Sequence, residues 1–342
     1  MSYKYMVRLK PIGCYYFGGE TTLGEGTAQN YYVKSNLLPQ VSALVGIIRY
    51  EILRQNRLLS YDINQKDTLA QVKRLIGSRG FCMGDSSKTF GIIQRLSPLF
   101  IENQAEGEFY TPLPLDYGLE IQLRSEVNCS FSAYANNAKV ADIIGYNAKD
   151  YDNYTYWISG NGNKLRTDEL FYTKEQVGIT KNGRAENDKD AFFKMILIGL
   201  NDAYNFAFIL ETSEPVAEVR QGVCALGGNR SMFQMNLTAL DVHKEPSDFC
   251  DYFQSLKKKG RLLLLGDAYL TDKQRDALPF FWANSICNRY IVTLHDQGHN
   301  WRKPLKTQKL YHLLARGGVL CCAPEDVPRP DCLCNVGLNI FI

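Results

Sequence analysis

Two apolar, strand-like runs on either side of a turn signal constrain the fold of this chain more than any other feature. The runs cover residues 169–179 (ELFYTKEQVGI) and residues 190–200 (DAFFKMILIGL). The polar stretch between them contains Asn182-Gly183, a dipeptide that favours tight hairpin turns. The pattern predicts a long hairpin over about 170–200 with a polar, basic-leaning tip, and such hairpins often serve as binding arms.

The N-terminal part predicts a strand, a loop and a helix in that order. Residues 4–17 have the alternating and aromatic character of a strand, and residues 18–27 form a glycine-rich stretch. In residues 40–56, apolar side chains recur at steps of three and four immediately after Pro39, which is typical of an amphipathic helix.

The rest of the chain mixes strands and helices without a regular βαβ rhythm, which favours an α+β fold. Further β structure is predicted for residues 90–123 and a strand for 204–211. A helix closed by lysines is predicted for 247–260. Residues 125–168 are rich in Asn, Tyr and Asp with weak periodicity, so a long loop or irregular insertion is expected there.

Length and composition limit the classes of protein that the chain could be. Its 342 residues favour two domains, and 45% hydrophobic residues are enough to form real cores. A net charge of +3 is small for a protein that binds nucleic acid unaided, although a local basic groove remains compatible with it. The N-terminus lacks the apolar core of a signal peptide, and no stretch approaches the ~20 apolar residues of a membrane span. With ten cysteines scattered in apolar runs, a reduced, cytoplasmic protein is expected.

Several segments, taken in order, resemble the RAMP superfamily of CRISPR proteins, and within it the third-subunit group of the type III-B Cmr complex. Residues 15–19 (YYFGG) precede a helix of the type Pro-x-x-Ser-x-x-x-Gly-x-x-Arg, which falls on Pro39, Ser42, Gly46 and Arg49.

Four later segments extend the resemblance over nearly the whole chain. Residues 96–116 resemble a hairpin that ends in a Pro-rich strand, and residues 170–195 a thumb-like hairpin. Residues 225–233 (ALGGNRSMF) resemble a Gly-Gly turn, with Asn229 where the group usually has an acidic residue. Residues 300–323 resemble a Trp-containing loop followed by a turn and strand, but Arg316 and Gly318 replace smaller residues and Ser.

The resemblance implies two ferredoxin-like (RRM-like) domains with long loops. The first would cover residues 1–212, including the protruding thumb at about 170–200, and the second residues 213–342. It also implies a non-catalytic subunit that binds the 5′ repeat-derived tag of CRISPR RNA and docks a large polymerase-like subunit and a backbone RAMP subunit in a hetero-oligomer. Target RNA would be read indirectly, through the guide.

Three alternatives remain open. The chain could be a repeat-processing endoribonuclease of the same fold, the equivalent subunit of a type III-A or III-D complex, or a general binder of single-stranded RNA.

The candidate RNA-binding residues combine three kinds of chemistry. Glycine pairs let backbone N–H groups approach phosphate, Arg offers a bidentate fork, and Trp beside basic residues suits single-stranded RNA. The resemblance adds the thumb residues. The alternatives are ordinary tight turns, solvated charges and a solvent-exposed hairpin. The candidates are Gly18, Gly19, Ser42, Arg49, Val177, Ile179, Lys181, Arg184, Gly227, Gly228, Arg230, Trp301, Arg302, Lys303, Lys306, Arg316, Gly317 and Gly318.

No metal, cofactor or catalytic centre is expected. An adjacent cysteine pair and a Cys-x-Cys, with His312 nearby, fit one tetrahedral zinc poorly, so buried free thiols are the simpler interpretation. These cysteines are Cys321, Cys322, Cys332 and Cys334. His295-Asp296 and His299 could suggest acid–base chemistry, but the sequence offers no consistent nucleophile, base and oxyanion donors around them.

Overall fold

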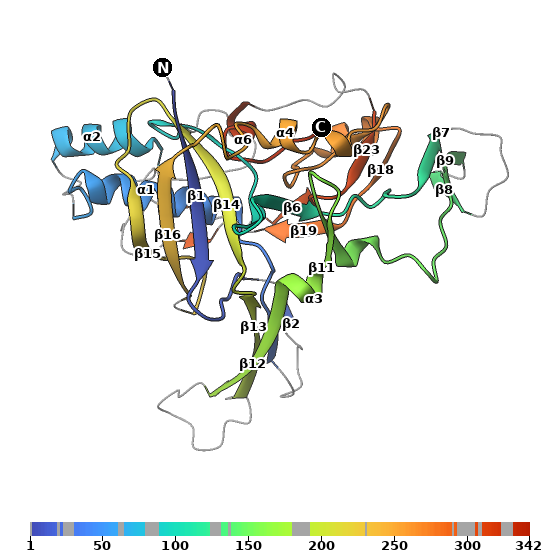
Figure 1. Cartoon of the computed structure of the whole chain (residues 1–342), viewed down its shortest axis with the longest axis horizontal. Coiled ribbons are helices and arrows are strands. Elements are labelled where there is room, and N and C mark those ends of the chain that lie inside the picture. The colour runs from blue at the N-terminus through green and yellow to red at the C-terminus, as the bar shows by residue number, and fades with distance from the viewer. Residues whose placement is uncertain are drawn as a thin grey trace.

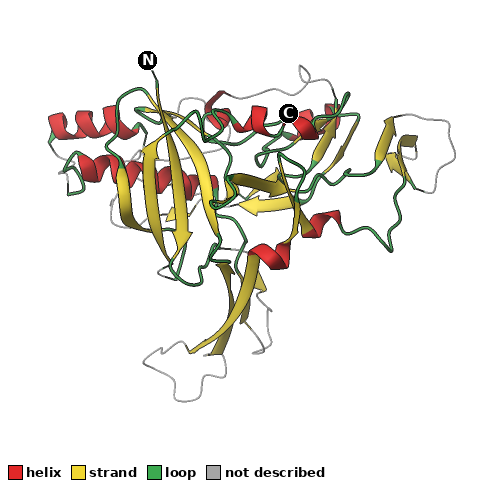
Figure 2. Cartoon of the chain, viewed as in Figure 1, coloured by secondary structure: helices red, strands yellow, loops and turns green. Residues whose placement is uncertain are grey.

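The computed structural model describes most of the chain. The described residues are 2–18, 21–22, 31–60, 65–78, 89–123, 131–135, 138–179, 192–229, 231–288, 291–292, 305–306, 310–322 and 331–342. Within them, strands predominate over a few helices, so the predicted α+β class is confirmed (Figures 1 and 2).

A nine-stranded sheet forms the centre of the molecule, with the order β11-β10-β6-β5-β14-β1-β16-β15 and with β4 also paired to β14. Its strands are β1 (Tyr3–Pro11), β4 (Ile93–Leu96), β5 (Phe100–Asn103), β6 (Glu108–Pro112), β10 (Tyr156–Ser159), β11 (Lys164–Arg166), β14 (Tyr204–Thr212), β15 (Val219–Ala225) and β16 (Met232–Ala239). β1 lies between two antiparallel neighbours, with Val7 opposite Phe208 on one side and Leu237 on the other.

The centre of this sheet has a split βαβ connection. The chain leaves β1, forms the helix α1 (Val41–Gln55), and returns as β4 on the far side of β14. Because β14 is antiparallel to both β1 and β4, these two strands run parallel. This arrangement is that of half a ferredoxin-like unit. Between β14 and β16, however, the chain forms the strand β15 where such a unit has its second helix. The presence of two complete ferredoxin-like domains stays a prediction.

One face of the sheet packs against α1 and α2 (Lys66–Ile76). Alternate side chains of β1, including Val7 and Leu9, point into this core and meet the apolar stripe of α1, where Leu44 and Ile48 are buried. The predicted helix at 40–56 is confirmed, because its apolar residues at steps of three and four form the buried face.

The opposite face of the sheet packs against the C-terminal part of the chain. Met6 and Phe100 share a second core with Phe249 of α4 (Phe249–Tyr252), and the rings of Phe100 and Phe249 lie 4.2 Å apart between centroids. A third core, around Leu264 and Leu320, lies within the C-terminal part.

The C-terminal elements are short. A three-stranded sheet has the order β17-β23-β18, and β19-β22 and β20-β21 are two-stranded. The elements are η2 (Gln254–Leu256), β17 (Leu262–Leu263), α5 (Asp272–Ala277), β18 (Phe280–Trp282), β19 (Ser285–Asn288), β20 (Ile291–Val292), β21 (Leu305–Lys306), β22 (Tyr311–Leu314), β23 (Val319–Cys321) and α6 (Asp331–Cys334). β15 and β16 belong to the central sheet, so chain on both sides of the proposed 212/213 boundary shares one sheet. The division into two domains stays a prediction.

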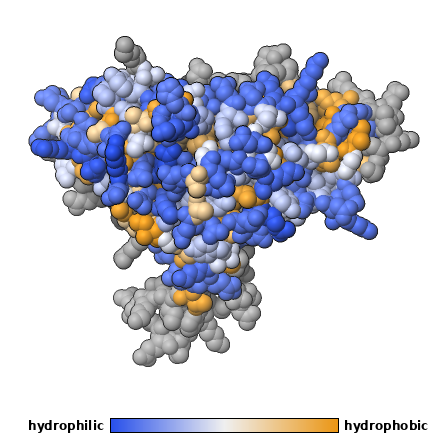
Figure 3. Space-filling model, viewed as in Figure 1, coloured by the Kyte–Doolittle hydropathy of each residue, from blue (hydrophilic) through white to orange (hydrophobic). Residues whose placement is uncertain are grey.

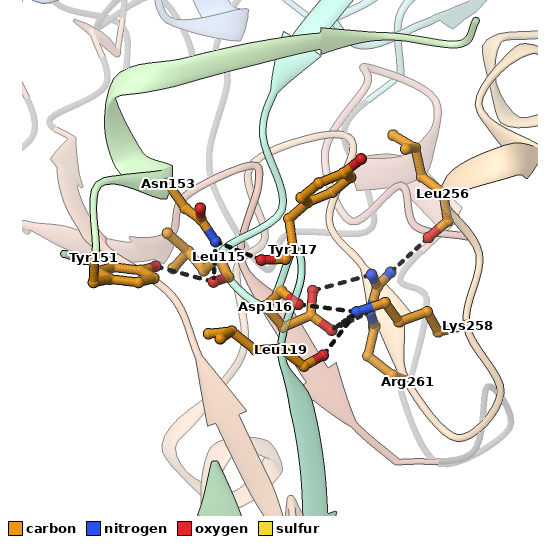
Figure 4. Close-up of polar contacts among 9 residues, drawn as sticks. All are labelled: Leu115, Asp116, Tyr117, Leu119, Tyr151, Asn153, Leu256, Lys258 and Arg261. Atoms are coloured by element: carbon orange, nitrogen blue, oxygen red, sulfur yellow. Dashed lines mark hydrogen bonds and ion pairs between the residues drawn. The ribbon is translucent and has the colours of Figure 1, made fainter. Parts of the chain in front are cut away.

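A buried ion cluster ties the loop after β6 to the C-terminal part (Figure 4). Asp116 accepts hydrogen bonds from the guanidinium of Arg261 and from Lys258 Nζ. Asn153 and Tyr151 donate to backbone carbonyls of the same loop. These contacts fix a segment that lacks regular secondary structure.

The predicted hairpin is present and projects from the body of the molecule (Figure 1). β12 (Phe171–Ile179) and β13 (Phe192–Leu200) pair antiparallel, with Phe171 opposite Leu200. β13 also pairs in parallel with β3 (Tyr31–Lys34), which in turn pairs with β2 (Thr21–Thr22). A short helix, α3 (Thr167–Leu170), leads into the hairpin, whose Asn-Gly turn lies outside the described residues.

The expectation of a long loop or irregular insertion over 125–168 is wrong where the chain forms strands. β7 (Glu120–Leu123), β8 (Ser132–Ala135) and β9 (Ala138–Ile144) form a small separate sheet. After η1 (Asn153–Thr155), β10 and β11 extend the central sheet, and Trp157 is buried. β8, β10 and β11 have only three or four residues, too few to produce a clear alternating pattern, whereas the seven-residue β9 was missed despite its length. No helix among the described residues is both long and apolar enough to cross a membrane.

Candidate nucleic-acid interface

Three parts of the chain that are far apart in sequence meet at the base of the hairpin. The segment after β1 pairs with β13, since Tyr15 N donates to Ile198 O at 2.7 Å and Ile198 N to Tyr15 O at 3.0 Å. The Gly227-Gly228 turn joins them from the other side, where Gly228 N donates to Tyr16 O at 2.8 Å. The candidate glycines therefore lie beside the candidate thumb.

Gly227 is required by this close approach. Its φ is +91°, and a Cβ added there would lie 2.4 Å from Tyr16 O and 2.8 Å from Phe17 Cδ1. The next residue but one, Asn229, is also left-handed (φ 51°), and its Nδ2 lies 3.4 Å from Oε1 of Gln176 on β12. Sequence reasoning missed this link, although an Asn after Gly-Gly is a known signal for left-handed backbone.

The turn at Gly227-Gly228 does not act as an amide nest in the expected way. The Gly228 N–H is already used by Tyr16 O, so it is not available to a phosphate. The observed role of the pair is backbone packing, and any contact with RNA would come from the exposed outer side of Gly227.

Gly18 begins the glycine-rich loop at an exposed position. Its carbonyl accepts a hydrogen bond from Asn36 Nδ2 at 2.5 Å, and the buried Ser35 Oγ accepts from Phe17 N at 2.7 Å. Apart from its chain neighbours, no atom of the described residues lies within 4 Å of the place where a Gly18 Cβ would sit. Gly19 lies outside the described residues.

Residues 172–177 of β12 are exposed, so both faces of this part of the strand are accessible. Tyr172 and Val177 are large apolar side chains with 48% and 68% of their surface accessible. Lys174 and Gln176 are also exposed, while Glu175 pairs with Lys194 across the hairpin at 2.8 Å. We define the thumb-base surface by its exposed members, which are Gly18, Gln176, Val177, Gly227 and Asn229.

The side chains of four further candidates in this region are not described. Ile179 ends β12 but its side chain is not placed, and Lys181, Arg184 and Arg230 lie outside the described residues.

Arg49 is buried inside the protein. It retains 9% of its accessible surface on the inner side of α1, its Nη2 donates to Thr89 O at 3.3 Å, and its guanidinium lies 5.4 Å from the centroid of the Phe90 ring. Burial lowers the pKa of Arg49 to about 10. The Arg49 guanidinium is therefore engaged inside the protein, and its role in contacting RNA stays a prediction. Ser42 in the first turn of the same helix is half-buried.

Arg316, Gly317 and Gly318 are also internal, and the RNA-binding role expected for them stays a prediction. Arg316 donates to Leu99 O from Nη1 at 2.6 Å and to Asp267 from Nε at 3.2 Å. The amides of Gly317 and Gly318 donate to backbone carbonyls. A Cβ on Gly318 would lie 2.5 Å from Ala283 Cβ, so packing explains the glycine.

The basic loop before β22 lies largely outside the described residues. Trp301, Arg302 and Lys303 belong to that undescribed part. Lys306 forms part of β21, which pairs with β20, but its side chain is not among those described.

The cysteines and histidines that the structure describes do not assemble into a metal site. Within these residues no group of three His, Cys, Asp or Glu side chains is placed to hold an ion. Burial raises the pKa of Cys321 to about 11, which opposes the thiolate that a metal requires. Cys287 Sγ lies 3.2 Å from His312 Nδ1 across β19 and β22, while His295, Asp296 and His299 lie outside the described residues.

The superposition on solved structures has low TM-scores but covers almost the whole chain. Two chains of type III-B Cmr-beta complexes are 12% and 10% identical, each with a TM-score of 0.47 and with 92% of this chain covered. The first complex is described as bound to cognate target RNA and AMPPnP and the second as bound to cognate target RNA; 85% and 86% of those chains are covered. A chain of a type III-A Csm3-Csm4 subcomplex is 13% identical, with a TM-score of 0.37 and 93% of both chains covered.

Sequence comparison gives a firmer result. No curated protein matches the chain. A family model described as CRISPR-associated protein (Cas_Cmr3) matches residues 7–286. Since this match spans more than half of the sequence, the chain belongs to the Cas_Cmr3 family of CRISPR-associated proteins.

Proposed function

We propose that this chain is a non-catalytic RNA-binding subunit of a type III-B CRISPR effector complex in the cytoplasm, with a role in antiviral defence. It holds the 5′ repeat-derived tag of the CRISPR RNA and docks a large polymerase-like subunit and a backbone RAMP subunit. The observation that carries the proposal is the family match over residues 7–286.

The geometry of the thumb-base surface supports an RNA-binding role. Single-stranded RNA is bound through splayed bases as well as through phosphates, so an exposed apolar side chain on a projecting arm is a suitable contact. Val177 provides such a side chain, and the exposed Gly18, which carries no side chain, would let a strand approach the backbone closely. A modest total charge is compatible with RNA that neighbouring subunits hold jointly.

Co-purification tests the proposal directly. The chain would be expressed with its genomic neighbours and recovered through an affinity tag, and the bound RNA would be sequenced. We expect a uniform RNA population that shares one repeat-derived 5′ end, together with a large polymerase-like subunit. Recovery of the chain alone, or with RNA of random sequence, would contradict the proposal.

A cleavage assay distinguishes the subunit from a processing nuclease of the same fold. Repeat RNA would be incubated with the purified chain without divalent ions, and with the variant His312→Ala. We expect intact RNA in both cases. Cleavage by the unchanged chain that His312→Ala abolishes would establish the nuclease instead. The identity of the co-purified backbone subunits separates type III-B from types III-A and III-D.

A further inference from the structure

A polar depression lies on the central sheet, on the face opposite α1 and α2. Met6, on this face of β1, is covered by the C-terminal part, but Arg8 and Lys10, two and four positions further along, are not part of that core. The depression has a volume of about 260 Å³. Its polar side chains come from β1, β14, β16, the residue after β5 and the turn before β14, and they are Arg8, Lys10, Gln104, Asp202, Asn205, Gln234 and Asn236.

The strand register explains why these side chains converge. Arg8 lies opposite Asn236 and Lys10 opposite Gln234 in the β1–β16 pair, while Asn205 belongs to β14 on the other side of β1. In Figure 1 these strands lie in front of α1, and Figure 3 shows the surface over them as largely hydrophilic. Four carboxamides, two cations and Asp202 therefore line one depression on the sheet, and Asn205 among them is itself buried.

Part of the hydrogen-bonding capacity in the depression is not used within the protein. Asn236 Oδ1 is buried and has no hydrogen-bond partner among the described residues. Buried polar atoms in folded proteins nearly always have a partner in the protein, in water or in a ligand. By contrast, Lys10 Nζ donates to Asp202 O at 2.9 Å and Asn205 Nδ2 to Gln104 Oε1 at 3.3 Å. Hydrogen bonds within the protein therefore hold some of the side chains in the depression in place, while Asn236 Oδ1 keeps an unused capacity to accept a hydrogen bond.

Arg8 is held in one orientation by two carboxylates. Its Nε and Nη2 donate to Glu102 at 2.8–2.9 Å, and Nη2 also donates to Glu245 at 2.6 Å. A guanidinium anchored in this way offers a flat, preorganised face to a planar ligand. It also loses much of its attraction for a phosphate, because the two carboxylates balance the charges of Arg8 and Lys10.

We propose that this depression binds a single nucleobase, in an RNA strand or a free nucleotide, through in-plane hydrogen bonds to the carboxamides of Asn205, Gln234 and Asn236. A carboxamide presents a donor and an acceptor side by side and matches the edge of a base. The volume lies just below the ~300–1,000 Å³ of typical drug-sized sites, so one base or nucleoside fits. No aromatic side chain lines the depression, which makes edge recognition the main source of affinity.

Calorimetric titration of the full chain with AMP, GMP, CMP and UMP tests the proposal. We expect saturable binding with a preference for one base, and none for ribose 5-phosphate, which lacks a base. The variant Asn236→Leu should weaken the binding of the preferred nucleotide by about tenfold or more. The matched control Gln122→Leu lies on the separate sheet formed by β7, β8 and β9. It should leave the affinity for the nucleotide unchanged.

A second variant separates recognition from a general loss of folding. Gln234→Glu replaces a donor by an acceptor at nearly constant size, so it should change which base is preferred while the melting temperature stays close to that of the unchanged chain. Short RNA oligomers with and without one abasic position distinguish the two sources of the base: tighter binding of the intact oligomer than of the mononucleotide indicates RNA. The proposal is overturned if none of the four nucleotides and no oligomer binds saturably at millimolar concentration. It is also overturned if Asn236→Leu and Gln122→Leu behave alike.

The inference does not depend on the proposed function. The titrations use the chain by itself, whereas the proposed function is tested by which RNA and which subunits co-purify. A chain that binds a base but recovers no effector subunits would support base binding in the depression and contradict the proposed function.

Discussion

Arg261 and Asp116 form a doubly hydrogen-bonded ion pair inside the protein. Arg261 Nε lies 2.9 Å from Asp116 Oδ2, and Nη2 lies 3.0 Å from Oδ1. Only 6% and 2% of the two residues are accessible, and Arg261 Nη1 also donates to Leu256 O at 3.1 Å. Each charge is therefore matched by its partner. Arg261 alone would be a buried, uncompensated charge, and Asp116 alone would keep only its contact with Lys258.

Replacing Arg261 should destabilise the protein strongly. Arg261→Leu leaves the Asp116 carboxylate buried with only the half-exposed Lys258 beside it, so we expect a loss of about 3–5 kcal/mol in the free energy of unfolding. Urea unfolding followed by circular dichroism measures this. The control Arg220→Leu removes an exposed arginine paired with Glu218 and should cost about 0–1 kcal/mol. Equal losses in the free energy of unfolding for the two variants would show that the buried pair contributes no more to stability than an exposed pair.

The turn at Gly227 should not tolerate any side chain. Gly227→Ala combines a left-handed φ with a Cβ placed 2.4 Å from Tyr16 O, so the turn must move away from the strand that it bridges. We expect a fall in melting temperature and weaker retention of RNA in the purified complex.

Gly46→Ala is the matched control for this variant. Gly46 is exposed within α1, and apart from its own helix backbone no atom of the described residues lies within 4 Å of its Cβ position. Alanine favours helix over glycine by about 1 kcal/mol, so this variant should be neutral or stabilising. A melting temperature for Gly227→Ala as high as that for Gly46→Ala would refute the packing argument.

Glu108 should make the stability of the protein depend on acidic pH. Burial alone would raise the pKa of Glu108, but hydrogen bonds from Tyr110, Asn161, Asn163 and Ser159 outweigh it and hold the pKa below its ordinary value. The stabilisation is therefore fully present above the pKa of Glu108 in the unfolded chain. It is lost as the pH falls through the lower pKa of the folded protein.

Unfolding measured between pH 7 and pH 3 tests this prediction. The unchanged chain should lose more stability over that range than Glu108→Gln, in which the titrating group is absent. Glu106→Gln, at an exposed position on the turn before β6, should follow the curve of the unchanged chain. Parallel curves for all three proteins would contradict the assignment.

The sequence predicted the features that depend on local pattern and missed those that depend on distant packing. The hairpin and α1 are encoded by alternation, a turn dipeptide and a three-to-four repeat within one segment. By contrast, the burial of Arg49 depends on Phe90, 41 positions later, and that of Arg316 on Asp267 and Leu99. Local sequence patterns carry no information on such long-range contacts. They therefore cannot distinguish these two arginines from arginines at an RNA-binding surface.

Assembly of the central sheet from distant strands was similarly hidden. β10 and β11 are four and three residues long and pair with each other, and β10 also pairs with β6, which lies more than forty positions earlier. Short strands give little alternating signal, and their burial on the sheet decides their conformation. Asn229 and Gln176 came together for the same reason, because the two residues belong to segments that meet only in the folded chain.

Val177 provides the sharpest test of the thumb-base surface. Its side chain is 68% exposed on β12, where a solitary apolar group gains nothing from folding. Val177→Asp should therefore leave the melting temperature almost unchanged, while it places a negative charge where the proposed RNA strand passes. We expect a clear loss of tag-bearing RNA from the purified complex.

The control for this charge is Val242→Asp. Val242 is 64% exposed in the turn after β16, so the substitution has the same chemistry and nearly the same accessibility away from the hairpin strands. RNA recovery, measured relative to protein, should fall for Val177→Asp only. A similar fall for both variants would point to a general effect of net charge, and no fall for either would remove β12 from the RNA-binding surface. Because neither substitution touches a buried contact, unfolding cannot account for a difference between them.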